Sequence, residues 1–318
     1  MNYTFDGHPM AEHVISRHQE LVTEAVLQAV PENQLAAIIM IGGYGRSEGA
    51  YTVSRHGYEP YNDYDYFVVF QDTSIEQARQ LVATIPDLEH QIGIEVDFFP
   101  LLREQLSSLE FSLMNAEMRA GHRVIWGDDR ILLRMKHMPL EQVPIAEFKR
   151  LLTNRGCLLL MNQHGLDQGQ FSKYINKVWL AIGDTMLRLV GHYRLSYLEK
   201  RELISEVIQD RVIAARYRRA VDIRMRPDLN DEWQQADFEE VRSTLLVLLT
   251  ALQTEDKISA FAAVMNYARH VRDHRLPWFD KLVFRHPRKR ITAGLVSLLR
   301  DPDEADAEQL LQLWGSYS

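Results

Sequence analysis

Cysteine is nearly absent from this sequence. The 318 residues include one, Cys157, which lies in the apolar stretch GCLLLM. A single cysteine cannot form a disulfide within the chain, and this usage is typical of a reducing compartment. No apolar run approaches the roughly 20 residues that span a membrane. The first residues, MNYTFDGHPM, lack the charged-then-apolar pattern of a secretory signal. We therefore expect a cytoplasmic protein without a membrane partner, in which Cys157 is buried and inert.

Positive charge is also in short supply. The sequence has 36 Lys and Arg against 44 Asp and Glu, for a net charge of −8. Proteins that bind nucleic acid generally neutralise phosphates with Lys and Arg, so this balance argues against a nucleic-acid partner. The one dense basic cluster is FRHPRKR, residues 284–290. We interpret it as a solvated surface turn, with contact to an anionic acceptor or an acidic partner as the alternative.

Three segments between residues 38 and 97 combine features suited to a metal-bound phosphate group. The first, IIMIGGYGRSEG, is an apolar run that ends in Gly42 and Gly43. This pattern predicts a strand followed by a tight turn, whose glycines allow the backbone to approach a ligand closely. Amide groups exposed at such a turn suit phosphate oxygens.

The other two segments carry carboxylates. NDYDYFVVF places Asp63 and Asp65 two residues apart, so both would face one side of a strand. Two adjacent carboxylates repel each other unless a cation lies between them, and a set of oxygen ligands suits Mg²⁺. IEVDFFP adds Asp97 on a later strand, completing a site for two metals about 3.5–4 Å apart, as in nucleotidyl transfer. Glu95 would share a face with Asp97 and is a rival third ligand.

The order of glycine turn, paired Asp and distant Asp resembles the nucleotidyltransferase superfamily, which includes polymerase beta and the antibiotic adenylyltransferases. The sequence is more closely similar to bacterial nucleotidyltransferase-domain proteins with a GGYGRGEG-like turn followed by NDYD. Here the turn reads GGYGRSEG over residues 42–49, and NDYD occupies residues 62–65.

This resemblance implies that Gly42 and Gly43 hold a triphosphate, and we add Arg46 as a residue that orients the phosphates. It also implies that Asp63, Asp65 and Asp97 bind Mg²⁺, with Asp97 activating the acceptor hydroxyl. The sequence departs from the superfamily at two points. The serine that usually follows the first glycine is replaced by Gly43, which has no hydroxyl, and the segment before the Asp pair is longer.

The stretch YINKVWLAIGD also resembles these nucleotidyltransferase-domain proteins. In the wider superfamily, a lysine on the helix after the catalytic domain often neutralises the triphosphate. The resemblance therefore implies this role for Lys177 or Lys173, and Lys177 matches better. Tyr193 is a weaker candidate, and Arg55 and His56 are interpreted as solvated.

The expected fold class is α+β. Residues 1–129 would form a nucleotidyltransferase-fold α/β domain with a small mixed sheet, and residues 130–318 an all-α bundle. Residues 51–61 are predicted to be a loop. Strands are predicted at 35–41, 64–70, 92–100 and 122–126. Helices are predicted at 10–30, 74–85, from a capping box at Ser107 to Gly121, 144–163, 171–191, 198–224, 238–253, 258–275 and 305–314.

The expected reaction moves NMP from an NTP, with ATP as the first candidate, to an acceptor hydroxyl and releases pyrophosphate. The acceptor would be a small molecule, a protein side chain or, against the net charge, an RNA end. An alternative is an antitoxin-like nucleotidyltransferase that binds or modifies a protein partner through its helical half. A nucleotide-binding regulator with a degenerate site is a third hypothesis, and the complete Asp set argues against it.

Overall fold

A computed structural model of the protein describes residues 2–55, 57–71, 81, 83–161, 167–228, 232–253, 287–301 and 304–316. Contacts within the chain group it into two compact units. The first contains residues 1–144 and 187–231, and the second contains residues 145–186 and 232–318. The predicted boundary near residue 129 between folding domains stays a prediction. Among the described residues, no helix has the length and apolar character needed to cross a membrane.

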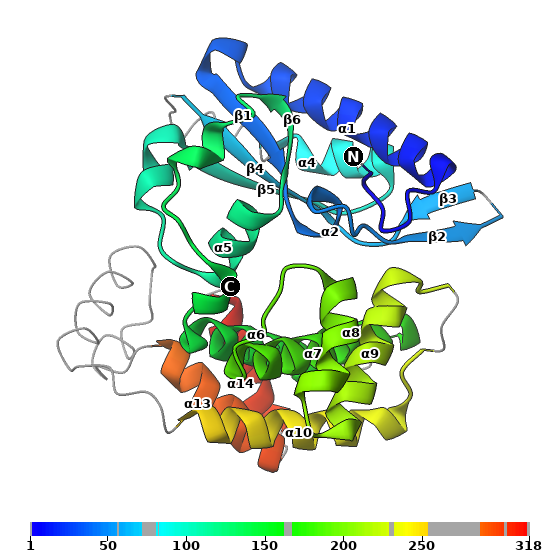
Figure 1. Cartoon of the computed structure of the whole chain (residues 1–318), viewed down its shortest axis with the longest axis vertical. Helices are drawn as coiled ribbons and strands as arrows, with labels where there is room; N and C mark the ends of the chain where they lie inside the picture. The colour runs from blue at the N-terminus through cyan, green and yellow to red at the C-terminus, as the bar shows by residue number, and fades with distance from the viewer. Residues whose placement is uncertain are drawn as a thin grey trace. The chain divides into compact units, whose positions relative to one another are not determined.

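A four-stranded mixed sheet forms the centre of the first unit (Figure 1). Its order is β5-β4-β1-β6, with β4 and β5 parallel and the other neighbours antiparallel. The strands are β1 Leu35–Met40, β4 Tyr64–Phe70, β5 Val96–Leu102 and β6 Arg123–Gly127. The two central strands are almost continuously buried, as their runs of apolar residues predict. All four correspond to predicted strands, although β5 begins at residue 96 rather than 92.

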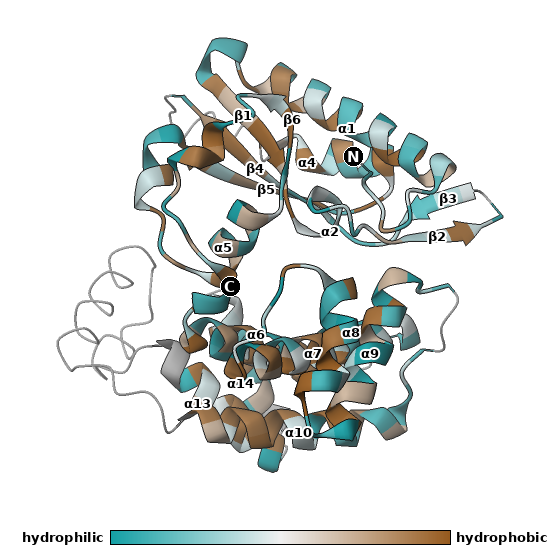
Figure 2. Ribbon diagram, in the orientation of Figure 1, coloured by the Kyte–Doolittle hydropathy of each residue, from teal (hydrophilic) through white to brown (hydrophobic). Residues whose placement is uncertain are grey.

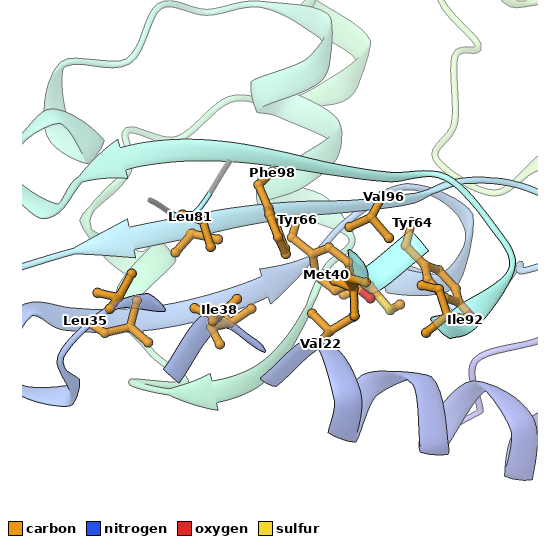
Figure 3. Packing of buried hydrophobic residues seen from close by; sticks show 14 of the residues in the cluster. Val22, Leu35, Ile38, Met40, Tyr64, Tyr66, Leu81, Ile92, Val96 and Phe98 are labelled. Carbon is orange, nitrogen blue, oxygen red and sulfur yellow. The ribbon is translucent and has the colours of Figure 1, made fainter. Parts of the chain in front are cut away.

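Helices α1 (Pro9–Ala29) and α4 (Ile85–Ile92) pack on the same side of this sheet. Ile15, Val22 and Val26 are buried in α1, at a spacing that puts them on one helical face. They join side chains that share one face of the strands, among them Met40, Tyr66 and Phe98 (Figure 3). Figure 2 shows hydrophobic residues along the strands. This cluster fixes the position of the strands in the sheet, and therefore the positions at which β4 and β5 begin.

The segment before the Asp pair is not a loop, so that prediction is wrong. It contains a hairpin of β2 (Tyr51–Ser54) and β3 (Gly57–Pro60). Gly57 has φ of 120°, which a side chain would resist, and it allows the chain to reverse. Pro60 lies at the end of its strand, where a missing N–H costs little. Too few apolar residues alternate here for the sequence to reveal the strands.

Two helix predictions between β4 and β6 need correction. The helix predicted at 74–85 would end just before Pro86, but Pro86 lies in the first turn of α4, where proline fits well. Most of the helix predicted at 74–85 lies outside the described residues. The hydroxyl of Ser112, not Ser107, caps the next helix, α5 (Leu113–Ala120), by accepting from the Asn115 amide.

All regular elements in the described residues after β6 are helices, which confirms the predicted α+β class. The long helix predicted at 198–224 is instead two, α8 (Tyr197–Val207) and α9 (Arg211–Met225). Asp210 separates them, because its carboxylate accepts from the amides of Val212 and Ile213 and starts a new helix. The α8–α9 hairpin belongs to the first unit.

The second unit is a helical bundle in which α6 contacts α10, α13 and α14. Helix α13 was not predicted, because its basic first turn, which starts at Pro287, was interpreted as a surface turn. The helix predicted at 258–275 lies outside the described residues. The bounds of the bundle helices are α6 Ile145–Met161, α7 Gln168–Leu189, α10 Gln235–Gln253, α13 Pro287–Arg300 and α14 Glu304–Gly315. The short helices are η1 Glu32–Gln34, α2 Gly42–Gly45, η2 Arg103–Ser108, η3 Ile131–Arg134 and η4 Leu140–Gln142.

Candidate active site

Three carboxylates converge where β4 and β5 begin. Asp63 directly precedes β4, Asp65 is its second residue, and Asp97 is the second residue of β5. The parallel register aligns Asp65 with Asp97. One carboxylate oxygen from each of the three lies within 4.8 Å of the others. The structure therefore brings together the Asp residues that the sequence singled out, while their roles as ligands and catalytic groups stay predictions.

The carboxylates repel one another in the absence of a cation. Burial raises the pKa of Asp97, and the negative charges of Asp63, Glu95 and Glu89 raise it further. The group offers oxygen ligands only, which is the set that Mg²⁺ prefers. These residues thus fit a magnesium site. Glu95, the rival ligand, is not one of the three residues whose oxygens converge.

The glycine turn packs directly against this group. Gly42 has φ of 68°, and a Cβ atom there would lie 2.9 Å from Oδ2 of Asp65. The Ile41 amide also donates to the Asp65 carbonyl over 2.9 Å. A glycine is therefore required at position 42 both by the backbone conformation and by the approach of the carboxylate. The first amides of α2, those of Gly42 and Gly43, have no acceptor within the helix.

We expect Gly42→Ala to impair metal binding as well as stability. The positive φ costs a side chain about 1–2 kcal/mol, and the added methyl group would displace the Asp65 carboxylate. Gly191→Ala is a matched control, because Gly191 has φ of 78° but nothing within 4 Å of a Cβ. Urea unfolding should show a lower free energy of unfolding in both variants. Calorimetric titration should show a several-fold loss of Mg²⁺ affinity in Gly42→Ala alone. Equal Mg²⁺ affinity in the two variants would contradict the packing argument.

Glu48, near the end of the GGYGRSEG turn, holds the start of α8. Its buried carboxylate accepts from the Ser196 hydroxyl and from the amides of Tyr197 and Leu198, at 3.0 and 3.3 Å. Burial would raise the pKa of Glu48, but Arg46 and these donors lower it below its usual range. The first amides of a helix need such an acceptor. The α8–α9 hairpin is thereby anchored to the turn.

Arg46 lies in this same buried network. Its guanidinium contacts Glu48 at 3.2 Å and Glu117 at 3.6 Å, and it lies over the Tyr197 ring, 5.0 Å from the centroid. Burial alone would lower the pKa of Arg46, but the carboxylates of Glu117 and Glu48 keep it above its usual range. These contacts support a structural role for Arg46, and its role in orienting phosphates stays a prediction.

Arg224 is a residue that sequence analysis missed. It lies near the end of α9, and its Nη2 would be 3.2 Å from a Cβ atom at Gly43. Its guanidinium lies 4.7 Å from the centre of the Tyr197 ring. No signal in the sequence distinguishes Arg224 from the other arginines of a heavily charged helix. Its place beside the turn is a result of tertiary packing.

The other predicted residues belong to α7, to the Arg46 network or to the start of α13. Lys177 and Lys173 are in the part of α7 that belongs to the second unit, and their proposed contact with phosphate stays a prediction. Tyr193 is buried, and its hydroxyl donates to Glu117. Within the basic segment 284–290, residues 287–290 begin α13, and the others lie outside the described residues.

No protein-family model matches the chain, and no curated protein matches it. Among solved structures, the chain is similar to spectinomycin adenyltransferase from Enterococcus faecialis, crystallised with ATP and spectinomycin. The two sequences are 12% identical, with a TM-score of 0.48. The similarity covers 72% of this chain and 98% of the other.

Proposed function

We propose that this protein is a metal-dependent nucleotidyltransferase. It would transfer NMP from an NTP, with ATP as the first candidate, to a hydroxyl of a small molecule or a protein, and release pyrophosphate. The observation that carries this proposal is the convergence of Asp63, Asp65 and Asp97 beside Gly42. Carboxylates at this spacing next to a glycine turn provide metal ligands and phosphate-binding amides in one place.

In the proposed reaction, the acceptor oxygen attacks the α-phosphorus of the NTP. A new P–O bond forms, the bond to the β-phosphate oxygen breaks, and pyrophosphate leaves with that electron pair. Asp97 would take the proton of the acceptor hydroxyl, and Gly42 and Gly43 would orient the phosphates. Mg²⁺ held by Asp63, Asp65 and Asp97 would neutralise phosphate charge and polarise the P–O bonds. The protein's main contribution would be positioning, since this chemistry needs no covalent intermediate.

Binding of a nonhydrolysable ATP analogue, measured by calorimetry, tests the proposal without knowledge of the acceptor. We expect binding with Mg²⁺ and a large loss of affinity when EDTA replaces it. Titrations with the GTP, CTP and UTP analogues would then establish base preference. Pyrophosphate release in the presence of candidate hydroxyl compounds would identify the acceptor. Failure of every NTP analogue to bind with Mg²⁺ would overturn the proposal.

A further inference from the structure

The guanidinium of Arg224 is held at the glycine turn without a carboxylate partner. Within the part of the chain that the structure describes, Arg224 forms no ion pair, and its buried Nε has no hydrogen-bond acceptor. Its contacts are with the face of Tyr197 and with the space beside Gly43. A partly buried arginine normally has an anion opposite its donors, because desolvating the charge is otherwise costly.

The surroundings of Arg224 hold it in place and leave its charge available. The Tyr197 ring has the cations of Arg46, Lys200 and Arg224 within 5.0 Å of its centroid. The Glu48 and Glu117 carboxylates contact Arg46, so they are engaged with a different guanidinium. Glu48 also fixes the start of α8, on which Tyr197 lies. Stacking on a fixed aromatic ring orients a guanidinium without using its N–H groups.

The Nη2 atom of Arg224 lies beside Gly43, next in the chain to the glycine that packs against the carboxylate site. Tyr44, in the middle of the turn, has its pKa raised mainly by burial, and the opposite charges of Arg224 and Asp63 both act on its hydroxyl. Gly42 contacts Asp65, and Gly43, the next residue, adjoins Arg224. A phosphate group at the turn would therefore have the carboxylate site on one side and Arg224 on the other.

We propose that Arg224 binds the phosphates of the NTP at Gly43, in the place where a side chain at position 43 would lie. This inference rests on the proposed function and adds a binding residue to it. Gly43 has no hydroxyl to offer a phosphate, and the Arg224 Nη2 atom, 3.2 Å from where its Cβ would lie, supplies a charged donor instead. Arginine is suited to this task because two of its N–H groups can bind two phosphate oxygens at once.

Calorimetry with Mg²⁺ and either the ATP analogue or inorganic pyrophosphate tests this inference. Arg224→Ala should weaken binding of both by roughly 10- to 100-fold, as expected for a hydrogen bond to a charged group. Arg224→Lys should lose less, because it keeps the charge but not the paired geometry. Arg218→Ala, on the same helix, is the matched control and should bind as wild type does. Circular dichroism would establish whether each variant is folded. If Arg224→Ala does not fold, the affinity of Arg224→Lys still tests the inference.

A serine at position 43 provides a second test. Gly43→Ser in the wild type should weaken binding, because its side chain meets Arg224 Nη2 and the Glu48 carbonyl, both 3.2 Å from the added Cβ. In Arg224→Ala, the same serine should restore part of the lost affinity, because its hydroxyl occupies the vacated place and donates to phosphate. Additive losses in the double variant would count against the shared position.

The outcomes separate the two proposals. If wild type binds the analogue with Mg²⁺ while folded Arg224→Ala and Arg224→Lys bind it equally well, Arg224 is not a phosphate ligand and the proposed function stands. If wild type binds neither probe, the proposed function itself fails, and this inference fails with it.

Discussion

Asp63→Asn and Asp65→Asn should each abolish nucleotidyl transfer while leaving the protein folded. Asparagine has nearly the same size as aspartate but lacks the negative charge that holds a divalent cation. The loss of several kcal/mol of charge stabilisation in the transition state corresponds to about a thousandfold or more in turnover. Turnover is measured as pyrophosphate release with the acceptor identified among the candidate hydroxyl compounds. Binding of the ATP analogue provides a second measurement that does not depend on the acceptor.

The fold should not suffer from these changes. The three carboxylates repel one another, so removing one charge should leave the free energy of unfolding unchanged or raise it by up to about 1 kcal/mol. Asp129→Asn is the control, since Asp129 is exposed and distant in sequence from the carboxylate site. Wild-type turnover in either Asp63→Asn or Asp65→Asn would sink the assignment of the metal site.

The same assay distinguishes Asp97 from Glu95. Asp97 converges with the other two carboxylates, whereas Glu95 acts on it only through its charge. Asp97→Asn should therefore cause a loss comparable to that in Asp63→Asn, and Glu95→Gln a much smaller one. The reverse order would make Glu95 the third ligand.

Glu48→Ala should cause the largest loss of stability. The substitution leaves buried Arg46 with Glu117 alone and removes the acceptor from the first amides of α8. Breaking a buried pair in this way costs about 3 kcal/mol or more. Glu48→Gln should lose less, because its side-chain oxygen still accepts hydrogen bonds. Urea unfolding measures the free energy of unfolding of both variants. A loss in Glu48→Ala smaller than that in the Glu20→Ala control described next would refute the anchoring role.

The control for Glu48 is an ion pair on the surface. Arg17 and Glu20 are both more than half exposed in α1, with 2.6 Å between their charged atoms. Glu20→Ala should change the unfolding free energy by no more than about 0.5 kcal/mol, as is usual for exposed pairs. The comparison isolates burial as the cause, because both variants remove a glutamate that contacts an arginine.

The anchoring role of Glu48 also predicts a dependence on pH. Its pKa is lowered in the folded state, so its contribution is complete above the ordinary carboxyl pKa and is lost as pH falls through the folded value. Wild type should therefore lose more stability than Glu48→Gln between about pH 5 and pH 3. Equal slopes for the two proteins would show that Glu48 keeps an ordinary pKa.

The sequence by itself determined the sheet and the carboxylate group. Long apolar runs predict central strands, because such strands are buried on both faces. Asp63 and Asp65 could be assigned to one side because side chains alternate along a strand. Asp97 joined them in the prediction because the order of glycine turn, paired Asp and distant Asp resembles the nucleotidyltransferase superfamily. The strands and the Asp pair are local features, and local pattern suffices to predict them.

Only the tertiary structure decided what surrounds that group. The β2–β3 hairpin and the break at Asp210 depend on pairing and capping that weak patterns do not specify. Glu48 is part of the GGYGRSEG turn, but its role depends on the amides of α8 that donate to its carboxylate. Arg224 lies more than 170 residues after Gly43 in the chain, and packing alone sets it beside the turn. Contacts between residues so distant in sequence are fixed by the packed fold, which is why local pattern could not predict them.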